Sequence, residues 1–271
     1  MFKIIKLEIF DSFKCLMDKC PDNCCNEDWT ISVDNETYGL YMQAGMPNLD
    51  SFISKEEPHV LIKKNGKCPF ITPEGLCLIH KELGEDFLGN TCKSYPRFVS
   101  TYKNFYNDLI IENIGLSCPA ASDWLLGLDR VVRLEEKVYY EQKNELGRKA
   151  KELPAEKNMK NIISFLQKRD SFIDGMRGCY EALGMEYTPI EFEVLGTKDL
   201  LLRNIAICFL FENLMLESQK EAPNYASVLD KICRILLIFD RELSEEIRKG
   251  IECNNDLLSD CLYRIMRNED H

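Results

Sequence analysis

The cysteines are the residues of this sequence best suited to chemistry. The chain of 271 residues contains 13 of them, and eight lie at or before position 118. Thiolates are ligands that both structural zinc sites and iron–sulfur centres accept. We therefore expect a metal centre built from the eight early cysteines, which are Cys15, Cys20, Cys24, Cys25, Cys68, Cys77, Cys92 and Cys118.

The first four cysteines form a compact group with the spacing C-x4-C-x3-C-C. Their thiols can converge on one centre only if the backbone turns sharply, and Pro21-Asp22-Asn23 supplies residues that favour a turn. The adjacent pair Cys24 and Cys25 is a poor candidate for a disulfide, because the small ring strains the disulfide geometry. As metal-bound thiolates, these two residues meet no such difficulty.

The later four cysteines are more widely spaced, and the last of them precedes a predicted helix. Pro119 suits the first position of a helix, so Cys118 is expected at the helix N-terminus. There the helix dipole and the free amide groups favour the thiolate over the thiol. Lys93 and Arg97 would also offset the negative charge that several thiolates bring to a metal.

The sequence leaves the type and number of centres open. Eight thiolates suffice for two four-cysteine sites, or for one cluster with spare thiols beside it. Structural zinc sites usually show two short cysteine knuckles, whereas Cys68 and Cys77 are nine positions apart. We therefore favour an iron–sulfur cluster of the 4Fe–4S type, with zinc as the alternative.

The remaining cysteines are expected to be core residues, because they fall in stretches with apolar residues at helical spacing. They are Cys179, Cys208, Cys233, Cys253 and Cys261.

Composition narrows the class of protein. Cysteine content lies below the roughly 8–10% that marks a disulfide scaffold, and no signal-peptide pattern stands at the start, so we expect a reducing, cytoplasmic location. The longest apolar run, Ile205 to Phe211, has seven residues, which is too few for a membrane span. The net charge of −11 disfavours a nucleic-acid partner, because phosphate binding normally requires a basic surface.

The chain changes character at Cys118, where we place a domain boundary. Residues 1–118 are predicted to be a cysteine-rich, metal-binding module of short strands and loops. Alternation of apolar and polar residues predicts strands over 5–9 and 29–33, and β-branched and aromatic residues predict a hairpin over 98–114.

Residues 119–271 are predicted to be mainly helical. We expect a first helix running to about Gly147, a charged linker over 148–160 and a buried central helix over 200–216. The expected fold class is therefore α+β, with a metal-organised module packed on a helical C-terminal region.

The cysteine-bearing motifs also resemble those of a known family. In chain order they are Phe13-x-Cys15, Cys20-x3-Cys24-Cys25, Trp29, Cys68-Pro69-Phe70, Gly75-Leu76-Cys77-x-Ile79-His80, Cys92-x2-Tyr95-Pro96-Arg97 and Ser117-Cys118-Pro119. Their order and spacing are similar to those of the flagellin lysine N-methylase (FliB) family. That family lies within a wider group of cysteine-cluster proteins described as zinc or iron chelators.

The resemblance implies transfer of a methyl group from S-adenosylmethionine to lysine side chains of flagellin or another protein substrate, by a protein that holds an iron–sulfur cluster. A lysine amine must be deprotonated and aligned before it accepts a methyl group, so we expect a general base or at least a desolvated pocket for the amine. Tyr95 and His80 are the candidate catalytic residues, and Arg97 is the candidate cofactor-binding residue. Each also has a structural interpretation: Tyr95 as a half-buried anchor, His80 as a surface residue or one that supports a metal ligand, and Arg97 as the partner of a carboxylate or of the cluster.

Two other functions fit the cysteines without methyl transfer. The first is an iron–sulfur redox or metal-handling protein, in which the vicinal Cys24 and Cys25 carry electrons or metal. The second is an interaction module that is held together by structural zinc.

Overall fold

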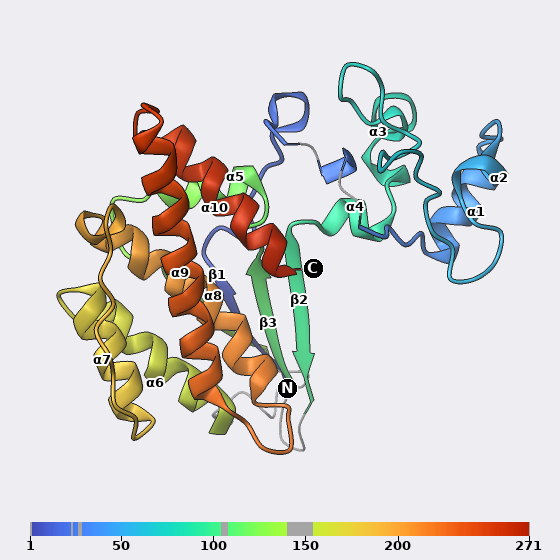
Figure 1. Cartoon of the computed structure of the whole chain (residues 1–271). Coiled ribbons are helices and arrows are strands. Elements are labelled where there is room, and N and C mark those ends of the chain that lie inside the picture. The colour runs from blue at the N-terminus through green and yellow to red at the C-terminus, as the bar shows by residue number, and fades with distance from the viewer. Residues whose placement is uncertain (1, 23, 27–28, 104–107, 140–153, 271) are drawn as a thin grey trace. The chain divides into compact units, whose positions relative to one another are not determined.

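The computed structural model of the chain describes residues 2–22, 24–26, 29–103, 108–139 and 154–270 (Figure 1). The chain forms two compact units. We call Lys14–Pro96 the cysteine unit, and Met1–Phe13 together with Arg97–His271 the sheet–helix unit. The units therefore do not divide at Cys118, because strands from both sides of the cysteine unit pair in one sheet.

A four-stranded sheet in the order β2-β3-β1-β4 lies in the sheet–helix unit. Parallel pairing joins β1 to β3, with Ile5 opposite Ile111, whereas β1 and β4 are antiparallel. The expected N-terminal strand and the expected hairpin are confirmed, the hairpin as the antiparallel pair of β2 and β3. The strands are β1 (Phe2–Leu7), β2 (Arg97–Tyr102), β3 (Asp108–Ile114) and β4 (Leu134–Tyr139).

The first helix of the C-terminal region is shorter than expected. Helix α5 (Pro119–Leu126) begins at the predicted proline, but the chain then forms β4 and does not continue as a helix toward Gly147. Gly147 itself lies outside the described residues. Strand pairing overrides the helical composition here, because β4 pairs along the whole length of β1.

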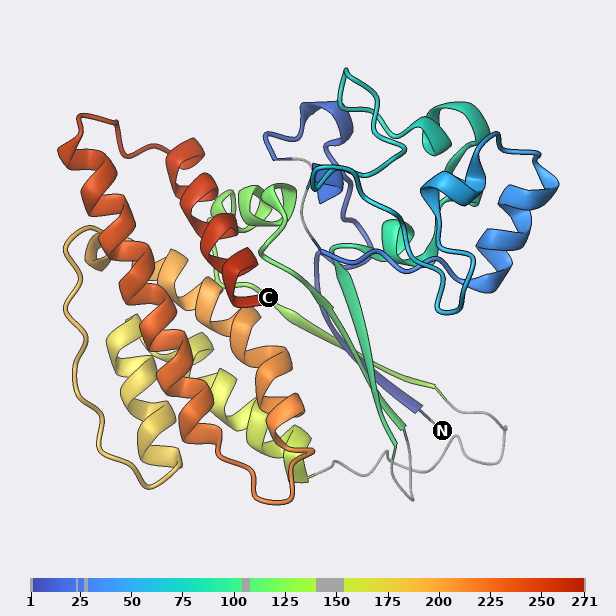
Figure 2. The same ribbon diagram turned by 45° about the vertical axis from the view of Figure 1, so that its right-hand side comes forward.

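The helices α6 to α10 lie on one side of the sheet (Figure 2). The expected central helix is confirmed as α8, in which Ile205, Leu210 and Phe211 are fully buried. Helix α8 contacts β3, α6 and α9, which explains why it is apolar on nearly all sides. Among the described residues, no helix is both long and apolar enough to cross a membrane. The elements are α6 (Pro154–Lys168), α7 (Phe172–Ala182), the short η5 (Leu195–Thr197), α8 (Asp199–Glu217), α9 (Tyr225–Arg248) and α10 (Asn255–Asp270).

The expected linker over 148–160 is wrong in its second half. Residues 154–160 belong to α6, whereas 148–153 lie outside the described part of the chain. The charges in this stretch do not all face water, since Glu156 is fully buried. A run of charged residues therefore did not mark a solvated connection.

A buried ion-pair network joins α6 to the sheet. Lys3 Nζ of β1 donates to Glu156 Oε1 at 2.8 Å, and Lys160 Nζ lies 2.6 Å from the same oxygen. Lys3 and Lys160 also pair with Glu136 of β4. Buried charges are tolerated only when they are paired, so these contacts fix α6 against β1 and β4.

The cysteine unit consists of short helices and loops around a small apolar core that includes Tyr41 and Phe70. The expected strand over 29–33 is wrong: Ser32 forms only an isolated bridge with Val60. Ile31 and Val33 of this stretch are buried, and Val33 belongs to the small apolar core. The elements are η1 (Met17–Lys19), η2 (Cys24–Asn26), α1 (Asn35–Gln43), α2 (Leu49–Phe52), α3 (Leu78–Leu83), η3 (Glu85–Phe87) and α4 (Asn90–Ser94).

Replacing Glu156 by alanine should lower the free energy of unfolding by about 3–5 kcal/mol, because Lys3 then stays buried without this carboxylate. Urea unfolding followed by circular dichroism measures the change. Glu193→Ala is the matched control, since Glu193 pairs with Arg248 at the surface and should cost less than about 1 kcal/mol. Equal costs for the two variants would contradict a structural role of the buried pair.

Candidate metal centre

Seven of the eight expected ligand cysteines lie in the cysteine unit, and Cys118 lies in the sheet–helix unit. Cys118 is the N-cap residue of α5, with Pro119 at the start of the helix. The expected position of Cys118 at a helix N-terminus is therefore confirmed. The cysteine unit thus contains seven of the expected ligands, from Cys15 to Cys92.

Backbone contacts bring three cysteine-bearing segments side by side. The Cys68 N–H donates to the Cys25 carbonyl oxygen at 2.8 Å, which ties η2 to the segment before α3. That segment folds back on itself, because Ile71 pairs with Cys77 in an isolated bridge. Cys77 then directly precedes α3. Cysteines that are more than forty positions apart in sequence thus become neighbours.

The Cys25 thiol is in hydrogen-bonding contact with two other sulfurs, those of Cys24 and Cys68. Because its proton is shared with both, the pKa of Cys25 lies far above its ordinary value. The same hydrogen bond from Cys25 lowers the pKa of Cys68 to about 7, against the opposing effect of burial. Of these two thiols, Cys68 is therefore the one that ionises first as the pH rises.

Cys77 and Cys92 extend this group. Burial raises the pKa of Cys77, and the sulfurs of Cys68 and Cys24 raise it further, while backbone amides at the start of α3 act in the opposite direction. Cys92 of α4 is exposed as a residue, yet desolvation of its thiol and the sulfurs of Cys68, Cys24 and Cys77 raise its pKa to about 12. We call Cys24, Cys25, Cys68, Cys77 and Cys92 the thiol cluster, because the ionisation of each affects or is affected by another of these sulfurs.

Cys15 and Cys20 are the two thiols of the unit outside this cluster. Burial raises the pKa of Cys20, and the charges of Cys15 and Cys24 raise it further. The Cys20 thiol donates to the Asp22 carbonyl oxygen at 3.1 Å, so it is held by the bend that follows it. Cys15 is exposed, and its sulfur accepts a hydrogen bond from the Met17 N–H at 3.3 Å.

The donor set of the thiol cluster suits a soft metal, since thiolates select zinc and iron–sulfur clusters over hard cations. Within the residues that the structure describes, no three or more Cys, His, Asp or Glu side chains are arranged as a metal site. The sulfurs are gathered, but their geometry is that of neighbouring thiols and not of a coordination sphere. The assignment of the eight cysteines as metal ligands stays a prediction.

The two candidate bases lie in the same unit as the thiol cluster. Tyr95 packs edge-to-face on Trp29, with the ring centroids 4.6 Å apart, and Trp29 Nε1 donates to the Cys24 carbonyl oxygen at 3.0 Å. His80 lies in α3, three residues after Cys77, and is half-buried. His80 is thus close to Cys77 in sequence, and Tyr95 is connected to Cys24 through Trp29. The catalytic role of both residues stays a prediction.

Arg97, the candidate cofactor-binding residue, belongs to the sheet–helix unit and has structural contacts there. Its guanidinium donates to the carbonyl oxygens of Phe10 and Phe13, both at 2.9 Å. It also lies over the rings of both residues, at 5.9 Å and 5.2 Å from their centroids. These contacts join the start of β2 to the chain that follows β1.

The structure adds Tyr41, which sequence reasoning missed. Tyr41 of α1 is buried against Phe70, and burial together with the charges of Cys92 and Cys77 raises its pKa. Its ring therefore packs in the same apolar core as the cluster cysteine Cys68. A tyrosine on an ordinary helix gives no signal of this position in the sequence.

Four of the five later cysteines are core residues as the sequence predicts, but Cys253 precedes α10 and is not a core residue. Cys179, Cys208, Cys233 and Cys261 are buried in the sheet–helix unit, whereas Cys253 is half-buried.

Known proteins similar to this chain carry names that describe lysine methylation and flagellar biosynthesis. Lysine-N-methylases of Salmonella typhimurium (strain LT2) and Salmonella choleraesuis are each 29% identical to the chain over 143 residues, which is 48% of the chain and 34% of each relative. The flagellar biosynthetic protein FliU of Salmonella muenchen is 29% identical over 138 residues, which is 46% of the chain and 78% of that relative. The resemblance to flagellin lysine N-methylases is confirmed.

The similarity is partial. The chain spans about a third of the length of the two lysine N-methylases that it matches. No family model matches the chain, and no solved structure matches it.

Replacing Cys25 by alanine should raise the pKa of Cys68 above about 7, because the thiol that donates to Cys68 is removed. In the reduced, metal-free protein, thiolate absorbance in the ultraviolet measures the ionisation between pH 6 and 8. Cys179→Ala is the control, since burial raises the pKa of Cys179 to about 12 and its loss leaves this range unchanged. An unchanged transition in Cys25→Ala would contradict the thiol contact.

Proposed function

We propose that this protein acts as a protein-lysine N-methyltransferase that uses S-adenosylmethionine and holds an iron–sulfur cluster on its cysteine unit. The observation that carries the proposal is the similarity to proteins named lysine-N-methylase, together with a gathering of thiols in one unit. Flagellin, or another protein with accessible lysines, is the proposed substrate, in keeping with the flagellar name of the third relative.

The chemistry of the thiol cluster supports a metal ligand set. Thiolates crowded in a desolvated region repel one another, so they either keep their protons or share a cation. The proposed ligands are drawn from the cluster cysteines Cys24, Cys25, Cys68, Cys77 and Cys92 and from Cys15 and Cys20 of the same unit. Cys118, in the sheet–helix unit, stays a ligand predicted from the sequence alone. When bound, the cluster would supply an inorganic core that neutralises the thiolates and stabilises the fold around them. Zinc is the alternative occupant of the same ligands.

The residues beside the thiol cluster offer groups that can handle the proton of a substrate lysine. A lysine ammonium must lose its proton before its nitrogen can accept a methyl group. In our proposal His80, on the first turn of α3, or Tyr95, against Trp29, accepts that proton. The half-buried aromatic surface of Trp29 and Tyr95 would help to exclude water from the lysine side chain.

A redox or metal-handling protein is the second candidate function. The observation that favours it is the Cys25 thiol, which shares contacts with both Cys24 and Cys68. Saturable binding of S-adenosylmethionine to protein purified without oxygen supports the methyltransferase. Reversible reduction without such binding supports the redox protein instead.

Cys24→Ser and Cys25→Ser should each abolish both the visible absorption of the purified protein and methyl transfer to lysine, because each removes a proposed ligand. The assay is transfer of labelled methyl groups from S-adenosylmethionine to flagellin, with the modified lysines identified by mass spectrometry. Cys179→Ser is the control, since Cys179 is buried in the sheet–helix unit and should keep both properties. Methylation that persists without the cluster would reject a catalytic role for it.

A further inference from the structure

Two thiols of the thiol cluster, those of Cys25 and Cys68, are held directly against one another. The Cys68 N–H donates to the Cys25 carbonyl oxygen at 2.8 Å, and the two thiols are themselves in hydrogen-bonding contact. Chain segments joined by backbone hydrogen bonds run about 4.7–4.9 Å apart, and a disulfide joins Cα atoms that are about 4.4–6.8 Å apart. The two backbones are therefore already at a spacing that a disulfide can bridge.

The Cys25 thiol also contacts the sulfur of Cys24, its neighbour in the chain. A disulfide between these adjacent residues closes a small ring, which strains the disulfide geometry. Cys68 is more than forty positions away in sequence, so a disulfide to it closes a large loop without that strain. Of the two sulfurs that contact Cys25, the sulfur of Cys68 is therefore the favoured disulfide partner.

The pair lies at the edge of the small apolar core. Cys68 is 6% exposed and belongs to that core, whereas Cys25 packs against it and is partly exposed. A small oxidant such as hydrogen peroxide can therefore reach the pair from the side of Cys25.

Oxidation of the pair by a peroxide is a balanced reaction in two steps. One sulfur is oxidised to a sulfenic acid while the peroxide is reduced to water. The other thiol then condenses with the sulfenic acid: the S–S bond forms, the S–O bond breaks, and a second water leaves with the proton of the thiol. Whichever sulfur reacts first, the product is the same disulfide.

A disulfide between Cys25 and Cys68 would take two thiols out of the thiol cluster. Of its five thiols, those of Cys24, Cys77 and Cys92 would remain. A zinc site built from cysteines alone and a 4Fe–4S cluster each use four thiolates. The oxidised thiol cluster therefore lacks a full set of ligands, whereas the reduced one has it.

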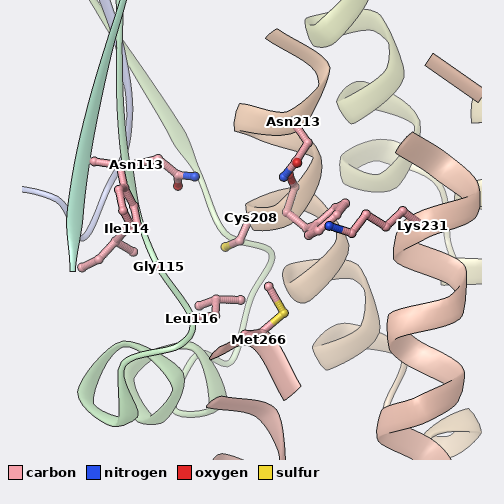
Figure 3. Close-up of a pocket in the computed structure, with 10 residues that line it drawn as sticks. Asn113, Ile114, Gly115, Leu116, Cys208, Asn213, Lys231 and Met266 are labelled. Atoms are coloured by element: carbon pink, nitrogen blue, oxygen red, sulfur yellow. The ribbon is translucent and has the colours of Figure 1, made fainter. Parts of the chain in front are cut away.

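Cys208 of α8 offers an internal comparison in the sheet–helix unit. Its side chain lines a cavity beside β3, as do Leu116 and Met266 (Figure 3). The described residues that line this cavity include no second cysteine. Oxidation at Cys208 therefore stops at a sulfenic or sulfinic acid and forms no disulfide within the cavity.

We propose that a reversible disulfide between Cys25 and Cys68 regulates metal uptake by the cysteine unit, which binds metal when this pair is reduced and not when it is oxidised. A peroxide is the oxidant, and thiol–disulfide exchange with a small dithiol restores the two thiols. The regulatory role rests on the metal ligands of the proposed function, whereas formation of the disulfide does not.

Peroxide treatment of the reduced, metal-free full chain tests this proposal. Remaining thiols are blocked after the reaction, and mass spectrometry identifies the disulfide-linked peptides. We expect Cys25–Cys68 as the main disulfide and none at Cys208. Zinc bound per chain is then measured after addition of zinc alone. The oxidised protein should lose the zinc uptake of the reduced protein, and treatment with dithiothreitol, followed by its removal, should restore it.

Two variants separate this pair from the neighbouring thiol. Cys24→Ser removes the other sulfur in contact with Cys25 and should leave the yield of the Cys25–Cys68 disulfide unchanged. In Cys25→Ser, Cys68 should remain outside any disulfide under the same treatment. Near-ultraviolet circular dichroism verifies that each variant is folded.

Other results overturn the proposal. A different main pairing, a mixture of many pairings, or oxidation that ends at sulfinic acids would show that Cys25 and Cys68 are not a disulfide pair. Zinc uptake that persists in protein with the Cys25–Cys68 disulfide would remove its regulatory role. Reduced protein that binds no zinc would contradict the ligand set and the regulation together, while the mapped disulfide still stands. A lack of methyl transfer changes none of these readouts, so the two proposals can fail separately.

Discussion

The crowding of thiols in the cysteine unit is the constraint on which its structure depends. Five sulfurs from η2, the segment before α3, and α4 influence one another's ionisation, and Cys25 shares its proton with two of them. Water is partly excluded, so several thiolates cannot coexist there without a cation. The rest of this unit consists of short helices and loops around a small apolar core. Such a unit gains most from a ligand that binds many of its segments at once.

The sheet–helix unit is stabilised by different means. Its central helix is apolar on nearly all sides, and its sheet joins chain segments from before and after the cysteine unit. The buried pair of Lys3 and Glu156 adds a polar tie between the sheet and α6. This unit therefore carries a core of its own, whereas metal binding is proposed for the cysteine unit.

The sequence pattern predicted those elements whose structure depends on neighbouring residues in the chain. The alternation around Ile5 predicted β1, and continuous apolarity predicted the buried α8. The proline after Cys118 predicted the start of α5. Prediction failed where a distant partner decides: β4 forms because β1 lies beside it, and Glu156 is buried because Lys3 neutralises it.

The candidate site shows the same division. Spacing of the cysteines selected eight residues; seven of them lie in the cysteine unit, five of these form the thiol cluster, and Cys118 lies in the other unit. It could not show that Cys68 has the lowered pKa, since that depends on a contact with Cys25 across more than forty residues. Nor could it place Tyr41 against the thiols, because that contact arises from the packing of α1 on the core.

The convergence of these cysteines on one inorganic centre is tested most directly by measuring iron, zinc and acid-labile sulfide per chain in protein purified without oxygen. We predict iron and sulfide in equal amounts, with visible absorption that disappears when the cluster is removed. Zinc without sulfide would contradict an iron–sulfur cluster, and protein that binds neither metal would contradict the convergence itself.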